Sequence, residues 1–153
     1  MENVGEVLIF VDSNMWLYYF GEDLPEHQFV KDSMKNLLLK EELVVNTIVV
    51  MEVAHHLIRV EPPEGCKEDI SLLLGLNNLQ IIDFDYEILI IALDFLNKYA
   101  HLGLGGRDAS ILATMSKMTI QQIFTHDNAF KRIQAAGLDP PIEVSDPIPE
   151  DLK

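Results

Sequence analysis

The sequence predicts an α/β fold built on a largely parallel sheet, from two observations. Short runs rich in β-branched residues alternate with longer amphipathic stretches, which is the strand–helix order of α/β proteins. The stronger runs, such as VLIFV at 7–11, are apolar at successive positions. That pattern is typical of parallel strands covered on both faces. At 153 residues the chain is most simply one domain.

Five strands and seven helices follow from these patterns. The strands are expected at 7–11, 43–46, 79–83, 122–125 and 142–144. The helices are expected at 14–20, 26–40, 47–60, 66–76, 85–100, 107–118 and 127–136. We expect Thr47, Asp85 and Asp127 to cap the third, fifth and last helices, and Gly137 to end the last one.

Two stretches are expected to lack regular structure. Residues 60–65 (VEPPEG) are interpreted as a loop inside the domain. Residues 139–153 hold four of the seven prolines, which favours a loose, extended end. The predicted organisation is therefore one domain over 1–145, followed by a loose tail over 146–153.

Charge is the informative part of the composition. Eleven Lys and Arg against 25 Asp and Glu give a net charge of −14. A protein that binds nucleic acid through phosphates normally shows a basic stripe, and here the longest basic cluster is Lys131–Arg132. Solubility explains an acidic surface in general. A more specific interpretation is that some of the acids bind cations.

The compartment is also indicated by the sequence. The single cysteine, Cys66, has no partner for an internal disulfide, which fits a reducing environment. The first apolar run has no basic region before it and an aspartate soon after it, so it resembles neither a signal peptide nor a membrane span. A cytoplasmic protein without a membrane partner is expected.

Polar residues follow two of the predicted strands. Asp12 and Asn14 come directly after the first strand, and Thr125 and Asp127 end the fourth. Ligands of open parallel sheets bind beyond the carboxyl ends of the strands, so these side chains are expected at one edge. The structural alternative is that Asp12 and Asp127 only form turns or cap helices.

Glu52 is unusual because its predicted helix, TIVVMEVAHHLI, is almost wholly apolar. No Lys or Arg lies within a turn of it, and burying an unpaired carboxylate is costly. Either a cation from elsewhere faces Glu52 or that side of the helix is wet. Glu52 and His55 form one Glu-x-x-His step, but a di-iron site needs two. The pair His55–His56 is better explained as an exposed helix face.

The stretch LGLGGRDASILATM at 102–115 raises the question of a phosphate-binding loop. A dinucleotide fingerprint requires a strand before its glycines, whereas here a predicted helix precedes them. The Lys-Ser/Thr pair of a P-loop is also missing. We interpret the glycines as a sharp corner that places Asp108, either as a helix cap or as a member of the acidic edge.

Four converging carboxylates would repel one another. One pair of charges 4 Å apart costs about 4 kcal/mol at an effective dielectric near 20, so cations must neutralise the cluster or some acids must protonate. Thiol-free oxygen clusters suit Mg²⁺ or Mn²⁺. Two such ions ~3.5–4 Å apart stabilise both oxygens of a phosphodiester displacement.

The contexts of these acids resemble the four acidic motifs of PIN domains. VDSNMWLYYF is similar to the opening strand and aspartate, and VVMEVAHHL to the second, helical motif. GRDASILATM resembles the third motif and IFTHDNAFKRI the fourth, in matching order and spacing over roughly residues 6–145. The size and single domain make the chain look like the VapC-type toxins of toxin–antitoxin pairs.

The resemblance implies a three-layer α/β/α sandwich with strand order 3-2-1-4-5, and metal-dependent cleavage of RNA with one or two Mg²⁺ or Mn²⁺ ions. By position it makes Asp12, Glu52, Asp108 and Asp127 the metal-site acids, with Asn14 and Thr125 as polar helpers. It also implies an antitoxin partner and a homodimer. Residues 61–78 match no motif, and are expected to form an added helix or a partner surface.

Three functions compete. The first is a metal-dependent endoribonuclease, a hydrolase in which metal-activated water cuts RNA. The second is a non-catalytic PIN fold that binds a protein partner, although all four acids are present. The third is a phosphohydrolase of haloacid-dehalogenase type, which needs Asp-x-Asp at the first strand, whereas Asn14 stands at the second position.

Overall fold

The computed structural model describes residues 7–138 and 141–152. Within them lie five strands: β1 (Leu8–Val11), β2 (Glu42–Asn46), β3 (Leu79–Ile82), β4 (Gln122–Phe124) and β5 (Glu143–Ser145). The helices are α1 (Ser13–Phe20), α2 (His27–Lys40), α3 (Thr47–Val60), α4 (Pro63–Leu74), α5 (Tyr86–Tyr99), the 3₁₀ turn η1 (Ala100–Leu102), α6 (Gly106–Met118) and α7 (Asn128–Ala136).

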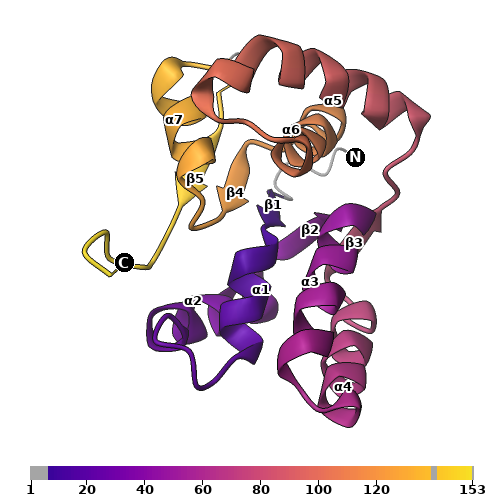
Figure 1. Cartoon of the computed structure of the whole chain (residues 1–153), viewed down its shortest axis with the longest axis vertical. Helices are drawn as coiled ribbons and strands as arrows, with labels where there is room; N and C mark the ends of the chain where they lie inside the picture. The colour runs from indigo at the N-terminus through magenta and orange to yellow at the C-terminus, as the bar shows by residue number, and fades with distance from the viewer. Residues whose placement is uncertain (1–6, 139–140, 153) are drawn as a thin grey trace.

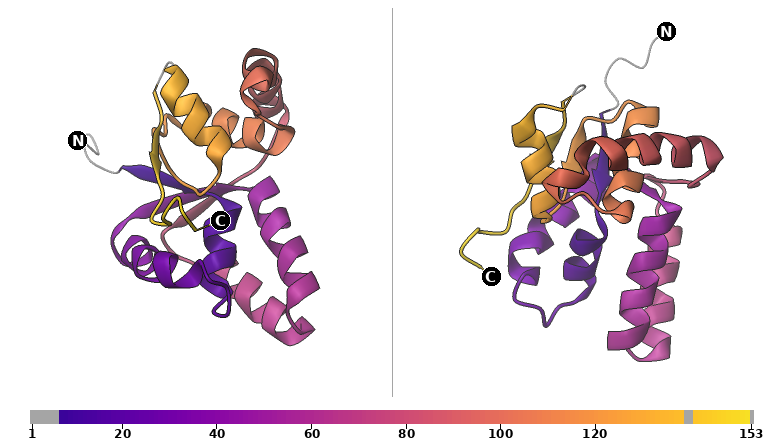
Figure 2. Two further views of the ribbon diagram at one scale, coloured as in Figure 1. Left: turned by 60° about the vertical axis from the view of Figure 1, so that its left-hand side comes forward. Right: turned by 45° about the horizontal axis from the view of Figure 1, so that its top comes forward.

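The strands form one five-stranded sheet in the order β3-β2-β1-β4-β5, with every pair parallel. This confirms the predicted fold class and strand order. Helices α1 to α4 cover one face of the sheet, and α5 to α7 cover the other (Figures 1 and 2). The central strands are buried on both faces: Phe10, Val11 and Val44 are fully inaccessible to solvent. Continuous apolar runs therefore predicted the parallel sheet correctly.

Helix ends follow the predicted caps with one correction. Asp85 and Asp127 cap α5 and α7 by accepting from backbone N–H groups, and Gly137 ends α7 in the left-handed region. Thr47 does not cap α3. The cap is Asn46, whose Oδ1 accepts from Val49 N at 2.8 Å, while Thr47 is the first helical residue and its Oγ1 accepts from Phe84 N at 3.0 Å.

The prediction of a loop over 60–65 is also corrected, because helix α4 begins at Pro63. Helices α3 and α4 form a hairpin (Figure 1). Proline is well suited to the first helical position, where it has no N–H to leave unpaired. The expectation of an added helix within 61–78 is met by α4. Two of its leucines, Leu72 and Leu74, remain exposed.

Residues 146–152, after β5, form no regular helix or strand, but the first of them are tied to the domain. Asp146 accepts from His126 Nδ1 at 2.7 Å, from Lys131 Nζ at 2.6 Å and from Ile148 N at 2.9 Å. Ile148 is buried. Lys153, the last residue of the predicted tail, lies outside the described residues. No helix of the described chain is both long and apolar enough to cross a membrane.

Candidate active site

The candidate site lies at the carboxyl edge of the sheet, beyond β1 and β4. Asp12 directly follows β1 and is fully buried. Its Oδ2 accepts from Thr125 Oγ1 at 2.7 Å, and Thr125, equally buried, follows β4. Adjacent parallel strands end side by side, so the two residues meet although 113 positions separate them.

Asp12 has two structural duties at this edge. It caps α1 by accepting from Ser13 N at 2.7 Å, and it accepts from the Nη1 of Arg107 at 2.5 Å. The capping alternative for Asp12 was therefore correct in part. Because its carboxylate also faces Arg107, the cap does not account for all of its contacts.

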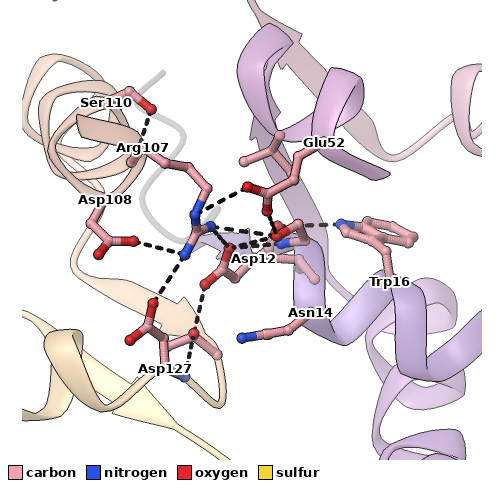
Figure 3. Close-up of polar contacts among 12 residues, drawn as sticks. Asp12, Asn14, Trp16, Glu52, Arg107, Asp108, Ser110 and Asp127 are labelled. Atoms are coloured by element: carbon pink, nitrogen blue, oxygen red, sulfur yellow. Dashed lines mark hydrogen bonds and ion pairs between the residues drawn. The ribbon is translucent and has the colours of Figure 1, made fainter. Parts of the chain in front are cut away.

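Arg107 is the centre of the cluster, as Figure 3 shows. Its guanidinium contacts all four motif carboxylates: Asp12 Oδ1 at 2.5 Å, Glu52 Oε2 at 3.3 Å, Asp108 Oδ1 at 2.7 Å and Asp127 Oδ2 at 3.0 Å. The acids come from the ends of two strands and from α3 and α6. The structure thus brings together the four acids that the sequence singled out.

The cation that Glu52 required is supplied by α6, from the opposite face of the sheet. Glu52 is also partly wet, since 40% of its side chain is exposed, and its Oε1 accepts from Ser13 Oγ. Ser13 was not among the predicted site residues. Its position directly after Asp12 was the signal for it. For Arg107, the signals were its place beside Asp108 and the lack of a local cation for Glu52.

The glycine corner delivers Asp108 as predicted, but not as a cap. Gly105 occupies the cap position of α6, so Asp108 lies in the first turn of the helix. Gly103 turns the chain before it with φ 87°, and a Cβ there would lie 2.6 Å from Arg132 Nη2. A helix and the 3₁₀ turn precede the glycines, which agrees with rejecting a dinucleotide loop.

The polar helpers lie beside the cluster. Thr125 joins Asp12 to the next acid, because its Oγ1 also accepts from Asp127 N at 3.0 Å. Asn14 Oδ1 accepts from His126 N at 3.4 Å and so connects the residues after β1 with those after β4. Thr125 is thus in contact with two of the acids, whereas Asn14 acts on the adjoining backbone.

Repulsion among the four carboxylates is reduced in both expected ways: a cation neutralises part of the charge, and one acid has a raised pKa. Four carboxylates and one guanidinium leave a formal net charge of −3 when all are ionised. Burial lowers the pKa of Arg107, but Asp12, Asp108 and Glu52 raise it by more than burial lowers it. The guanidinium therefore stays charged. Burial raises the pKa of Asp108 to about 6; Arg107 opposes this shift, and Asp127 and Asp12 add to it.

The donor set fits a divalent metal in its chemistry, since it consists of carboxylate oxygens without thiols. Within the described residues, no three Asp, Glu, His or Cys side chains are arranged as a ready metal site. The guanidinium of Arg107 lies among the four carboxylates instead. His55 and His56 are exposed on α3, as expected for a solvated helix face.

Comparison with known proteins identifies the family of this chain. The PIN domain model matches residues 9–136. The chain belongs to the PIN-domain family. This assignment sets aside the haloacid-dehalogenase alternative, and the nucleases of the PIN family are typically metal-dependent. No curated protein sequence matches this PIN domain significantly.

Solved structures similar to this PIN domain include a VapC toxin and VapBC complexes. VapC20 of Mycobacterium tuberculosis, a toxin that cleaves the sarcin–ricin loop, has a TM-score of 0.71 at 20% identity, over 85% of this chain and 95% of that one. VapBC2 of Rickettsia felis, bound to a promoter DNA fragment, has 0.68 at 17%, over 92% and 98%. VapBC-1 of nontypeable Haemophilus influenzae has 0.64 at 18%, over 92% and 98%.

Proposed function

We propose that this PIN domain is a Mg²⁺- or Mn²⁺-dependent endoribonuclease, the toxin of a toxin–antitoxin pair. The observation that carries the proposal is the convergence of Asp12, Glu52, Asp108 and Asp127 on one cation at the sheet edge. Acids that served only as caps or surface residues would have no reason to share one partner. Family membership supports nuclease chemistry, and the similar VapC structures support the fold.

The four acids differ in burial, and the proposed roles follow these differences. Asp12 and Asp108, whose side chains are 0% and 12% exposed, are the rigid inner ligands that would hold a metal. Asp127, at 28%, would complete a second, weaker position. A bound divalent metal supplies Lewis acidity toward water and the phosphodiester. Thr125 keeps Asp12 oriented through its hydrogen bond.

Glu52 is the acid best placed to handle the attacking water. It is the most exposed of the four and belongs to α3, not to a strand end. Its Oε1 is oriented by Ser13, so the carboxylate is held while one side faces solvent. Glu52 would orient the water and take its proton. Attack by water leaves 5′-phosphate and 3′-hydroxyl ends on the RNA.

RNA would be held through few phosphate contacts. Of the basic residues near the site, Lys131 is paired with Asp146 at 2.6 Å and Arg132 donates to Leu102 O at 2.8 Å. Both side chains border a hollow of about 860 Å³ that also includes Asp127. With a net charge of −14, binding would depend on local contacts and not on a general field.

Partners are proposed on the same basis. Similar structures were crystallised as toxin–antitoxin complexes, and an antitoxin is the partner we propose here. A homodimer is also proposed, because Tyr86, Ile90 and Leu93 form an exposed apolar stripe along α5. Apolar stripes of this kind mark protein interfaces. Light scattering tests the dimer, which should have twice the molar mass of one 17.4 kDa chain. The Ile90→Lys variant should have the molar mass of the monomer.

A second candidate is a PIN fold retained only for binding a protein. The contacts of Arg107 favour it, because the guanidinium occupies the carboxylates that a nuclease needs for metal. Binding of Mn²⁺ near millimolar or tighter argues against this candidate.

The deciding experiment is cleavage of structured RNAs with Mg²⁺, with Mn²⁺ and with EDTA, followed by analysis of the new ends. We expect cleavage with metal, none with EDTA, and 5′-phosphate products. Asp12→Asn should abolish cleavage, while Asp32→Asn, an exposed change of equal charge on α2, should not. Cleavage that persists in EDTA, or in Asp12→Asn, contradicts the proposal.

A further inference from the structure

One side chain of the protein already occupies the carboxylates assigned to the metal. Arg107 reaches Asp12 and Asp108 through separate nitrogens, Nη1 and Nη2, and it reaches Glu52 through Nε. All of its donor groups are thus spread over the acidic cluster. A guanidinium and a divalent metal on the same carboxylates compete for oxygen lone pairs and repel each other, so each weakens the binding of the other.

We propose that Arg107 is an exchangeable internal cation, which neutralises the acidic cluster in the metal-free protein and must leave it when a divalent metal binds. The inference rests on the proposed function, because it takes these acids as the metal site. It adds that metal affinity is set by an exchange of cations within the chain. The family match and the similar structures say nothing of this residue.

Several features of Arg107 suit exchange and not permanent attachment. Its side chain is 24% exposed, and the contact with Glu52 at 3.3 Å involves a carboxylate that is 40% exposed. The residue lies in the first turn of α6, next to the glycine corner. Its guanidinium contacts in the described chain are all with side chains and not with backbone carbonyls, so another cation can replace it at these groups.

A bound metal also has an electrostatic advantage over the guanidinium. A divalent ion gains about twice the Coulomb energy of a single charge at equal distance from the same carboxylates. The cluster keeps a formal charge of −3 with Arg107 in place, so it still attracts cations. Removing Arg107 should therefore make metal binding tighter, which is the opposite of what removing a ligand or a structural residue does.

The first test measures Mn²⁺ affinity by calorimetry in the wild type, Arg107→Gln and Arg59→Gln. Arg59 is exposed in the last turn of α3, so its variant has the same net charge without touching the cluster. We expect Arg107→Gln to bind Mn²⁺ at least about tenfold more tightly than the wild type, and Arg59→Gln to bind within about twofold.

The outcomes separate this inference from the proposed function. Equal or weaker Mn²⁺ binding by Arg107→Gln overturns the exchange and leaves the nuclease proposal standing. Absence of binding by every protein overturns both. If only Arg107→Gln binds Mn²⁺, the result supports the exchange, and it shows that Arg107 excludes the metal from the wild-type cluster.

A second test needs no variant that might fail to fold. The chain has three arginines, Arg59, Arg107 and Arg132, so the ¹H–¹⁵N spectrum has three Nε–H signals. Titration of the wild type with Mg²⁺ should shift or broaden the Arg107 signal and leave that of Arg59 unchanged. An Arg107 signal that stays constant while calorimetry shows Mg²⁺ binding contradicts the exchange.

Discussion

Arg107 Nη1 donates to Asp12 Oδ1 over 2.5 Å across a separation of 95 residues. The pair joins the end of the central strand β1, where Asp12 caps α1, to the start of α6, and so connects the sheet with helices of both layers (Figure 3). Because Asp12 is fully buried and Arg107 is largely so, each charge depends on the other. The variants below test what this cluster contributes to stability and to metal binding.

Asp12 and Asp127 should control stabilisation by metal. Mn²⁺ should raise the melting temperature of the wild type, by mass action worth about 2.7 kcal/mol at a hundred times its dissociation constant. Asp12→Asn and Asp127→Asn should respond less, because each removes a carboxylate from the cluster. Asp32→Asn, on the exposed side of α2, should respond as the wild type does. A wild-type melting temperature that ignores Mn²⁺ contradicts the metal site.

Asp12→Asn should destabilise the metal-free protein. The oxygens of Asp12 accept from Ser13 N, Arg107 Nη1 and Thr125 Oγ1. An amide nitrogen in place of Oδ1 would face the N–H groups of Ser13 and Arg107, and in either orientation Asn removes the charge that balances Arg107, at a cost of about 1–3 kcal/mol. Denaturant melts in EDTA measure the loss, and stability equal to the wild type would show that Asp12 is not held as described.

Asp108→Asn should have the opposite effect at neutral pH. The pKa of Asp108 is about 6 in the fold, raised mainly by burial, against about 3.9 when unfolded. The ionised form is therefore disfavoured in the fold, and stability falls as the pH rises from about 4 through 6. Removing the charge should add about 1–2 kcal/mol in EDTA at pH 7.5, and the gain should vanish near pH 4.

Glu61, directly after α3, should make stability depend on pH at a second place. Burial and hydrogen bonding to Asp69 raise the pKa of Glu61 to about 7, and its Oε2 is buried without a partner among the described residues. Its stabilising, protonated form is present at acid pH and lost as the pH rises through 7. Glu61→Gln should melt higher than the wild type at pH 8.5 and equally at pH 4.5; equal melting at both values contradicts the shift.

Asn46 should prove to be the cap of α3, not Thr47. Asn46 Oδ1 caps the helix, and its Nδ2 donates to Ser110 Oγ and Thr114 Oγ1 at 3.3 and 3.2 Å. Asn46→Ala should cost about 2–3 kcal/mol, the sum of a lost cap and an unpaired buried network. Asn46→Ser keeps a capping oxygen without adding a charge to this fully buried site, so the difference between the two variants measures the cap. A loss below that of Thr47→Ala would reverse the assignment.

Local patterns in the sequence determined the elements of this protein. Strand ends fall within one residue of the predictions, because continuous apolar runs can be satisfied only between two helical layers. The caps Asp85 and Asp127 were readable for the same reason, since capping involves residues close in sequence. The same rules did not decide whether Asn46 or Thr47 caps α3, because both residue types are good caps. They also did not decide where in 60–65 the loop ends and α4 begins.

The four acids were found one at a time, each from its own context: two after buried strands, one in an apolar helix and one behind a glycine corner. Their common partner was not, because Arg107 meets Asp12, Glu52 and Asp127 only when α6 folds against the edge of the sheet. The guanidinium lies between the four acids because the ends of two strands and parts of α3 and α6 come together in the fold. Arg107 and Asp12, for example, are 95 residues apart in the sequence. Sequence therefore determined which groups carry the charge, and only the tertiary structure decided which charge they share, because Coulomb interactions depend on distance in space.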